Sequence, residues 1–412
     1  MIRLLHLSDV HMSAGFANKS SYVRNQIKDA LYETIVYAID YIIENDLEGL
    51  ILAGDFFDDD KVSFKDEHFV MNQFIRLLDD HRKIFYVTGN HDPMLTARFL
   101  ESLTKHDLFY FFEDDTIKCL DIISRCGVPY KVVGVGHKSK NEQRNLIKHF
   151  PCRSTDEIWI GIAHASVPSA IDIADKVRYM ATPLSQIEAL DYNYFALGHI
   201  HIRQLLTPKI GYSGNLQGLN IKETGSKGGY LVTLTPNATK IESVDFNVIR
   251  WEQCELMLSS NIRTLSELQQ VLVDHVTSSI GSIQAAAKQI IIRVNVQGRS
   301  PLKKQLELDS NRSFLEEIIK DKTGLLDLEI KSRNLSNHYD LEELSNENTI
   351  LSQMIKRISD ETYEKDLMEK IVELPIFDGK LTRQDKEAYL LAMKTHLLQD
   401  VIERMVVRLD EN

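Results

Sequence analysis

The sequence has little cysteine and no long apolar run. Its four cysteines are Cys119, Cys126, Cys152 and Cys254, and none forms a C-x-x-C pair, which argues against a structural zinc site. So few cysteines in 412 residues also argue against a disulfide framework. No stretch approaches 18 apolar residues, so no membrane span is expected, and the N-terminal segment is typical of a strand rather than a signal peptide. The cysteine usage favours a reducing, cytoplasmic compartment.

A P-loop is also missing. The stretch Gly134-Val135-Gly136-His137-Lys138 lacks the G-x-x-x-x-G-K-[ST] spacing, so any use of ATP would require a partner that hydrolyses it. The net charge of -12 does not favour non-specific binding to nucleic acid. The charge is unevenly distributed, however: from Asp340 onward there are 17 acidic and 10 basic residues, a net of -7, which leaves -5 for the other 339 residues.

The order of apolar segments predicts the architecture. Strands alternate with helices over the first 200 residues and are then followed by strands alone, which predicts an α/β domain with a two-sheet sandwich flanked by helices. Composition shifts near Pro236–Asn247. We therefore predict a first domain over 1–245, a small α+β module over 250–335 and a helical tail over 340–412.

Metal-capable side chains follow five of the predicted strands, each at its carboxyl end. Such ends converge at one edge of a sheet, where ligand sites form. Carboxylate, imidazole and amide groups suit manganese, iron or zinc better than magnesium alone or copper, and a carboxylate such as Asp55 can bridge two cations about 3.5–4 Å apart. The candidates are Asp9, His11, Asp55, Asn90, His91, His164, His199 and His201.

Other polar groups have simpler interpretations. The run Asp58-Asp59-Asp60 resembles a metal site in isolation, but a solvated turn is favoured. His6 alternates with apolar neighbours and is expected in the core. His137 and His149 compete as ligands, but neither is predicted to follow an apolar strand.

Together these residues resemble the five motifs of the calcineurin-like metallophosphoesterases. The matching stretches are Asp9-Val10-His11, Gly54-Asp55, Gly89-Asn90-His91-Asp92, His164 and Gly198-His199-Ile200-His201. Two later stretches, Tyr212–Gln217 and Lys227–Tyr230, are similar to the SbcD-type DNA-repair exonucleases and especially to the YhaO-like group. The resemblance covers residues 1–235. One departure is Ala165 after His164, where Gly or Gln is usual.

The resemblance implies a role for each matching residue. One metal would be held by Asp9, His11, Asp55 and His201. The other would be held by Asp55, Asn90, His164 and His199. His91 would bind no metal but would face the scissile phosphate or protonate the leaving oxygen, with Asp92 orienting its ring.

The resemblance also implies a two-metal DNA nuclease, an exonuclease with endonuclease activity as well. Its cofactors would be two Mn²⁺, with Fe²⁺, Zn²⁺ or Mg²⁺ as alternatives, and Lys222 and Lys227 are candidates for contacts with the DNA backbone. It would act as a homodimer with an SMC-like coiled-coil ATPase. Two alternatives stay open: the same site acting on a small phosphoester or phosphoprotein, and a mainly scaffolding subunit. The tail would either pack on its own domain or bind the partner's coiled coil.

Overall fold

The computed structural model describes two compact units of the chain. The described residues are 1–15, 19–58, 62–93, 98–168, 170, 178–281, 283, 287–337, 346, 349–358, 370 and 385. Unit 1 consists of Met1–Gln253, Ile280–Ile292 and Leu325–Asp327. Unit 2 consists of Cys254–Ser279, Arg293–Gly324 and the residues from Leu328 onward. Most of the predicted tail over 340–412 lies outside the described residues, apart from helix α9 (Ile350–Ile358) and a few single positions.

The first sheet of unit 1 holds the first four strands of the chain side by side. Strands β1 to β4 run parallel, β11 is antiparallel to β1, and β12 is antiparallel to β11. Because β1, β2 and β3 are parallel neighbours, their carboxyl ends share one edge of the sheet. In order across the sheet, the strands are β12 (Thr239–Asp245), β11 (Gly228–Leu234), β1 (Ile2–Leu7), β2 (Gly49–Ala53), β3 (Lys83–Val87) and β4 (Phe109–Phe112).

The second sheet also has a parallel centre. Strands β6, β7, β8 and β10 run parallel, and the two edge strands β5 and β9 are antiparallel to their neighbours. Strand β2 of the first sheet packs against β7 and β8. In order across the sheet, the strands are β5 (Lys118–Ile123), β6 (Pro129–Val135), β7 (Ile158–His164), β8 (Tyr194–Gly198), β10 (Ile210–Tyr212) and β9 (Gln204–Thr207).

Alternating side chains of these strands build three apolar layers. On β2, Ile51 and Ala53 face the layer between the two sheets, whereas Leu50 and Leu52 face the helices. On β8, Phe195 and Leu197 contribute to the layer outside the second sheet. Strands that are buried on both faces have continuous apolar sequences, so they could be predicted from the sequence. The predicted α/β two-sheet sandwich is confirmed.

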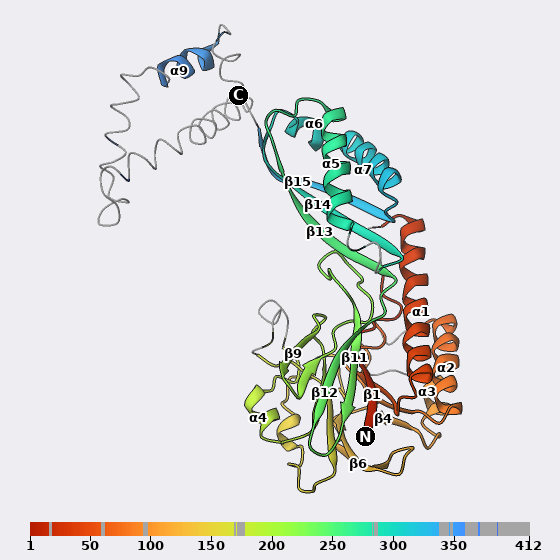
Figure 1. The fold of residues 1–412 in the computed structure, drawn as a ribbon. Coiled ribbons are helices and arrows are strands. Elements are labelled where there is room, and N and C mark those ends of the chain that lie inside the picture. Colours follow the sequence, from red (N-terminus) through yellow and green to blue (C-terminus); the bar gives the residue numbers. More distant parts are fainter. Residues whose placement is uncertain are drawn as a thin grey trace. The chain divides into compact units, whose positions relative to one another are not determined.

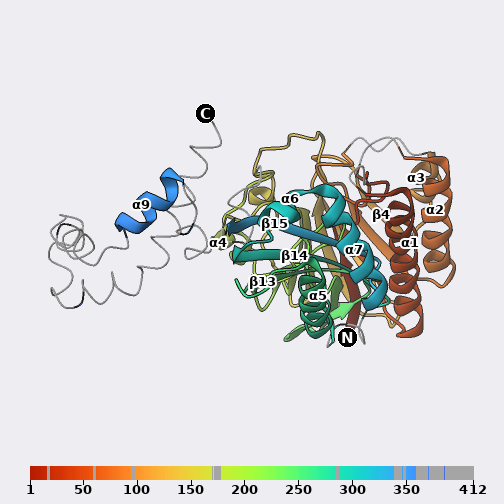
Figure 2. The same cartoon turned by 90° about the horizontal axis from the view of Figure 1, so that it is seen from above.

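Helices flank the two sheets of unit 1. They are α1 (Ser21–Glu44), α2 (Phe64–Asp79), α3 (Arg98–Leu103), the 3-10 helix η1 (Ile147–His149) and α4 (Leu184–Glu188). Helices α1, α2 and α3 lie along one side of unit 1 and α4 lies on the opposite side, as both views show (Figures 1 and 2).

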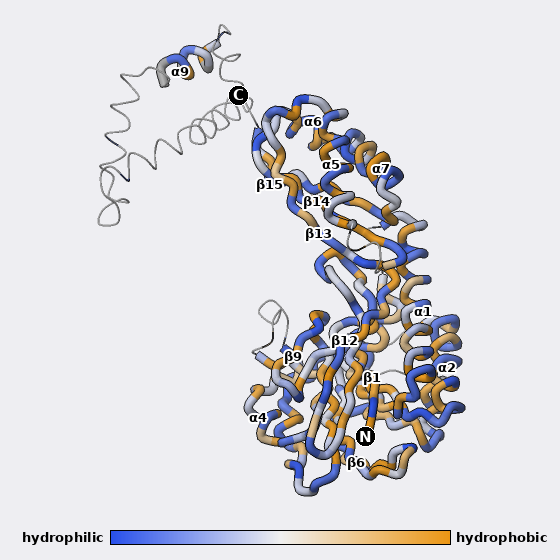
Figure 3. Tube along the Cα trace, in the orientation of Figure 1, coloured by the Kyte–Doolittle hydropathy of each residue, from blue (hydrophilic) through white to orange (hydrophobic). Residues whose placement is uncertain are grey.

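Helix α1 is amphipathic. Its hydroxyl cap is Ser20, whose side chain accepts a hydrogen bond from the backbone N–H of Val23. Hydrophobic and hydrophilic residues alternate along the helix (Figure 3). Its apolar face is buried and includes Val23, Ile27, Leu31, Ile35, Ala38, Ile39 and Ile42.

Unit 2 combines one sheet with helices. Its strands, in the order β13-β14-β15, begin within unit 1 residues and continue into unit 2. Helix α7 ends at Gly324, which has a φ of 69° and donates its N–H to the carbonyl of Lys320. The elements are β13 (Ile249–Leu258), α5 (Leu265–Ile280), β14 (Gln289–Ser300), α6 (Lys303–Glu307), α7 (Asp309–Thr323) and β15 (Asp327–Asn337). Among the described residues, no helix has the length and apolar character needed to cross a membrane.

Candidate metal centre

The predicted ligands lie where the parallel strands of the two sheets end. Asp9 and His11 follow β1, Asp55 follows β2 and Asn90 follows β3. In the second sheet, His164 is the last residue of β7, and His199 and His201 come directly after β8. The pairing of β2 with β1 and β3, and of β7 with β8, brings these loops to one edge.

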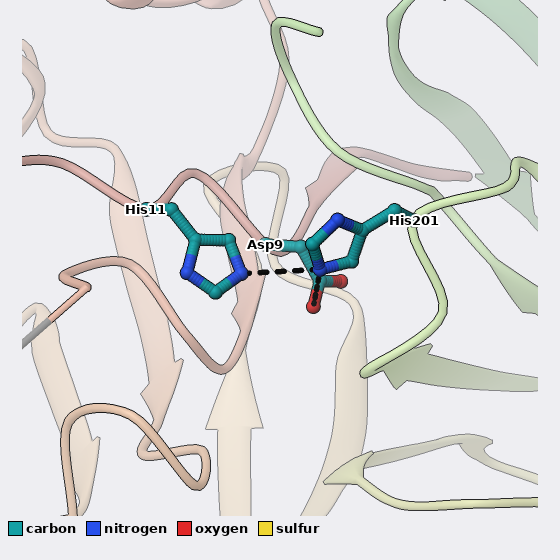
Figure 4. Close-up of side chains that lie close together, drawn as sticks. All are labelled: Asp9, His11 and His201. Carbon is teal, nitrogen blue, oxygen red and sulfur yellow. Dashed lines mark hydrogen bonds and ion pairs between the residues drawn. The ribbon is translucent and has the colours of Figure 1, made fainter. Parts of the chain in front are cut away.

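A first group of side chains comes from the loops after β1 and β8 (Figure 4). Nε2 of His201 lies 3.2 Å from Nε2 of His11 and 3.7 Å from Oδ1 of Asp9. The three ligand atoms lie within 4.8 Å of one another. Both oxygens of Asp9 also accept the backbone N–H of His199 at 3.1 Å, so the loop after β8 is tied to the loop after β1.

A second group surrounds Asp55. Its Oδ2 lies 3.1 Å from Nε2 of His164, and the same nitrogen lies 3.1 Å from Oδ1 of Asn90. Oδ2 of Asp55 also lies 3.9 Å from Nε2 of His11, which belongs to the first group. The ring of His199 packs edge-on against that of His164, with centroids 5.5 Å apart. Asp55 therefore contacts both groups, the position that a bridging carboxylate needs.

The backbone at these positions is strained. Asp9, His11 and Asp55 each have a φ of 50°, and His199 has a φ of 103°. Left-handed conformations cost free energy in residues with a side chain and cluster at functional sites. Two hydrogen bonds hold the loops in this form, from the N–H of Asp9 to the carbonyl of Gly54 and from the N–H of His11 to that of Asp55, both 3.1 Å long.

Two glycines allow the loops to approach. A Cβ on Gly54, which has a φ of 88°, would lie 2.4 Å from Nδ1 of His164. A Cβ on Gly89 would lie 2.1 Å from Oδ1 of Asp55. Because neither position has room for a side chain, the Gly-Asp and Gly-Asn pairs of the sequence are explained by packing against the ligands themselves.

The ring of His91 is held by Asp58 and not by Asp92, which corrects the predicted contact. Its Nδ1 donates to the main-chain carbonyl of Asp58 at 3.1 Å and lies 3.5 Å from the Asp58 carboxylate. The side chain of His91 is 43% exposed, so it is open to a substrate. Its backbone N–H donates to Oδ1 of Asp55 at 2.8 Å, which places it beside the ligand groups.

Asp92 is buried and acts on the loops instead. Among the hydrogen bonds of the described residues, its Oδ2 accepts the hydroxyl of Tyr86 at 2.6 Å and the N–H of Phe56 at 2.9 Å, and its Oδ1 accepts the N–H of Gly89 at 2.7 Å. Burial and the nearby Asp55 raise the pKa of Asp92. Asp92 thus ties the loop after β2 to the loop after β3.

Asp58 was expected in a solvated turn but contributes to the site. Its carboxylate lies 3.0 Å from Nδ1 of His11, and its side chain is only 36% exposed. With His11 and His91 it forms a third group that has the composition of a metal site. Asp59 and Asp60, the rest of the acidic run, lie outside the described residues.

The centre combines buried carboxylates with imidazoles. Burial opposes the charged form of each group, yet the carboxylates of Asp55 and Asp9 outweigh it and raise the pKa of His164 to about 9. Burial likewise opposes ionisation of Asp55, but His164 and His11 hold its pKa well below the usual range. Oxygen and imidazole donors gathered in this way suit divalent cations, so the residues fit the metals that the motifs imply.

Two neighbouring histidines lie outside the ligand groups. His6 is buried, as expected, with its Nδ1 2.7 Å from the Tyr194 hydroxyl, and burial lowers its pKa to about 3. His137 was not expected after a strand, but it follows the end of β6 at Val135. Its Nε2 donates to the carbonyl of His164 at 2.6 Å, and its ring is buried.

Sequence reasoning missed Glu223 and misplaced Lys227. Nδ1 of His201 lies 2.8 Å from Oε1 of Glu223; burial would raise the pKa of that carboxyl, but His201 lowers it to about 2. The ammonium group of Lys227 is buried and donates to the carbonyl of His201 at 3.2 Å. Lys227 therefore belongs to the wall of the site, which corrects the expected surface contact with DNA, whereas Lys222 is exposed.

The fold and the clustered carboxylates and imidazoles define a metal-dependent phosphoesterase. The family model for calcineurin-like phosphoesterases matches residues 2–203, which include all the proposed metal ligands. The chain therefore carries a calcineurin-like metallophosphoesterase domain.

The sequence similarity to known proteins extends beyond that domain. An uncharacterised metallophosphoesterase, YhaO of Bacillus subtilis strain 168, is 24% identical over 335 residues, covering 77% of this chain and 76% of YhaO. A DNA double-strand break repair protein Mre11 of Sulfurisphaera tokodaii is 22% identical over 347 residues, covering 78% of this chain and 81% of that protein. Among solved structures, a dimetal phosphatase from Danio rerio is 13% identical with a TM-score of 0.37, covering 58% of this chain and 95% of that one.

Proposed function

We propose that the protein is a two-metal DNA nuclease that hydrolyses phosphodiester bonds during DNA-end processing and repair. The observation that carries this proposal is the cluster in which Asp55 lies between the group of Asp9, His11 and His201 and the group of Asn90, His164 and His199. We assign two Mn²⁺ to these groups. Divalent cations, when bound, polarise a phosphoester and neutralise its developing charge.

The residues of this chain would orient the substrate and supply a proton. Nδ1 of His91 donates to a carbonyl oxygen, which can only accept, so Nε2 is the nitrogen left for the phosphate or the leaving oxygen. Asp58 fixes that ring, and Asp92 fixes the loop from which it projects. The partial exposure of His91 beside ligands that are mostly buried suits a long substrate that passes over the surface.

DNA as the substrate is supported by the relatives. Several of them, including the Sulfurisphaera tokodaii protein, bear the name DNA double-strand break repair protein Mre11. The exposed Lys222, next to Glu223 in the loop beside the site, is the candidate contact for a DNA phosphate. We further propose a homodimer that works in the cytoplasm with an SMC-like coiled-coil ATPase, since the sequence has no P-loop of its own.

We assign these tasks to three segments. Residues 1–245 would hydrolyse the phosphodiester, residues 250–335 would cap the site and contact DNA, and residues 340–412 would bind the ATPase. The proposed metal ligands all fall in the first segment, together with Lys222.

The test is a manganese-dependent assay on end-labelled linear DNA, with wild type beside His91→Gln. The variant should lose about 10²–10⁴-fold in kcat because a positioned acid contributes that much. Its manganese binding should stay unchanged, because His91 is not a proposed ligand. The matched control is His149→Gln, an exposed histidine on η1, which should cleave like wild type.

Two outcomes would replace the proposal. If wild type hydrolyses bis-nitrophenyl phosphate but never DNA, even with its partner present, the substrate is a small phosphoester or a phosphoprotein. If wild type hydrolyses neither substrate faster than His91→Gln does, the chain is a scaffolding subunit.

A further inference from the structure

Glu223 lies behind one of the proposed metal ligands. Its side chain is 11% exposed, and its Oε1 lies 2.8 Å from Nδ1 of His201. Three further donors hold the carboxylate: Nδ2 of Asn220 at 2.8 Å on Oε1, and Nδ2 of Asn215 at 2.7 Å and the N–H of Leu219 at 2.8 Å on Oε2. The orientation of the carboxylate is therefore fixed by donors other than His201.

This contact sets the tautomer of His201. An ionised carboxylate can only accept, so Nδ1 carries the proton and Nε2 presents its lone pair. Nε2 is the atom that lies 3.2 Å from His11 and 3.7 Å from Asp9. A carboxylate behind a metal-binding imidazole also makes that imidazole a stronger donor to a cation.

The same loop fixes the backbone of His201. The carbonyl of His201 accepts the ammonium group of Lys227 at 3.2 Å and the N–H of Asn215 at 3.3 Å. The loop is anchored in turn to the residue after β1, because the hydroxyls of Ser8 and Ser213 are hydrogen-bonded at 2.8 Å. His201 is thus held at both its ring and its main chain by residues 213–227.

The second group of ligands has a different support. Nδ1 of His164 lies 2.9 Å from the neutral main-chain carbonyl of Ala53. Within the described part of the chain, the Glu223 carboxylate is hydrogen-bonded to His201 of the first group but not to Asn90 or His164 of the second. The two groups are therefore unequal, since a charged side chain supports one histidine and a backbone carbonyl supports the other.

We propose that Glu223 is a positioning residue that sets the affinity of one metal position, the one formed by Asp9, His11 and His201, and leaves the other position largely unaffected. This inference rests on the two-metal centre of the proposed function. Glu223 acts through the ring of His201 and touches neither substrate nor metal.

The test is calorimetric titration of Mn²⁺ into metal-free, full-length protein. Wild type should bind two ions. Glu223→Gln should weaken one of them about 10–100-fold, the usual effect of removing an outer partner, and should leave the other within about twofold. A glutamine cannot replace the carboxylate, because both oxygens of Glu223 accept hydrogen bonds. In either orientation the NH₂ group of the glutamine would face a donor, which is Nδ1–H of His201 on one side and the N–H groups of Asn215 and Leu219 on the other.

The matched control is Glu242→Gln, the same substitution at an exposed carboxylate of β12 that pairs with Lys240. It should bind both ions as wild type does. If Glu223→Gln fails to fold, Glu223→Asp carries the same test, since its shorter side chain cannot keep both ends of the contact. Equal weakening of both ions, or no weakening of either, would overturn the proposal.

Calorimetry separates this inference from the proposed function. A wild type that binds two ions but cuts no DNA would refute the nuclease and leave the role of Glu223 intact. A wild type that cuts DNA, with both ions unaffected by Glu223→Gln, would refute the role of Glu223 and leave the nuclease intact.

Discussion

The main-chain carbonyl of Asp58 lies 3.1 Å from Nδ1 of His91, while the carboxylate of the same residue lies 3.0 Å from Nδ1 of His11. Asp58 thus connects the proposed acid with a proposed metal ligand. Asp58→Asn should lower kcat about tenfold, less than the loss expected for His91→Gln, because the main-chain contact remains. KM for DNA should stay within about twofold, since substrate binding is not altered. Steady-state cleavage of labelled DNA with manganese measures both constants.

The control for Asp58 is Asp121→Asn, which neutralises an exposed carboxylate paired with Lys131 away from the site. That variant should match wild type in both constants. An Asp58→Asn protein with full kcat, or with a change confined to KM, would show that Asp58 does not act through the two histidines.

Manganese should stabilise the folded protein, and Asp55 should be necessary for the effect. Each site that binds only the folded state adds about 2.7 kcal/mol at a metal concentration 100 times Kd. Asp55 contacts both ligand groups, so Asp55→Asn should abolish the gain from both sites. Thermal unfolding with manganese and with a chelator measures this. An Asp55→Asn protein that gained as much as wild type would exclude Asp55 as the bridging ligand.

The sequence was most informative where strands are buried on both faces. Strands β1, β2, β3, β7, β8 and β10 can be located in the sequence, because fully buried strands form continuous apolar runs. Strands β5 and β12 were not foreseen. Both lie at sheet edges and most of their residues are exposed or partly buried, which leaves only a weak apolar signal.

Residues of the site were predictable where a motif follows a strand and were missed where a distant loop supplies them. Glu223 is 22 positions from His201, and no local spacing connects the two. Asp58 stands in an acidic run that is typical of solvent-exposed turns, yet it contacts His11. Lys227 carries a charge and was therefore expected at the surface, but it is buried and its ammonium group donates to the carbonyl of His201. Contacts of this kind depend on how the loops pack, which composition does not encode.

Gly54→Ala should impair both stability and metal binding. The φ of 88° alone costs about 1 kcal/mol for a residue with a side chain. The added Cβ would also overlap the ring of His164, 2.4 Å away, and such overpacking costs about 1–3 kcal/mol more. Displacing that ring should weaken one manganese ion. Urea unfolding of the metal-free protein and calorimetric titration measure the two effects.

The matched control for Gly54 is Gly127→Ala. Gly127 has a similar φ of 78°, but a Cβ there would meet nothing within 4 Å. It should lose about 1 kcal/mol through its backbone and bind manganese normally. Equal losses in the two variants, with manganese binding intact in both, would mean that Gly54 is needed only for its backbone conformation.

His6 should make the metal-free protein less stable as the pH falls. Burial lowers its pKa to about 3 in the folded protein, from 6.5 in the unfolded chain. Between these values the unfolded chain binds a proton that the folded protein refuses, so the free energy of unfolding decreases as the pH drops from 6.5 towards 3. From pH 7 to pH 5 the His6 contribution is about 2 kcal/mol. His6→Asn keeps an acceptor for Tyr194 but does not titrate, so wild type should lose about 2 kcal/mol more than the variant over this interval. Urea unfolding in the presence of a chelator at pH 7 and pH 5 measures the difference in the free energy of unfolding. If both proteins lost the same free energy of unfolding over this interval, the pKa of His6 would not be lowered by folding, and His6 would be protonated in the folded protein at pH 5.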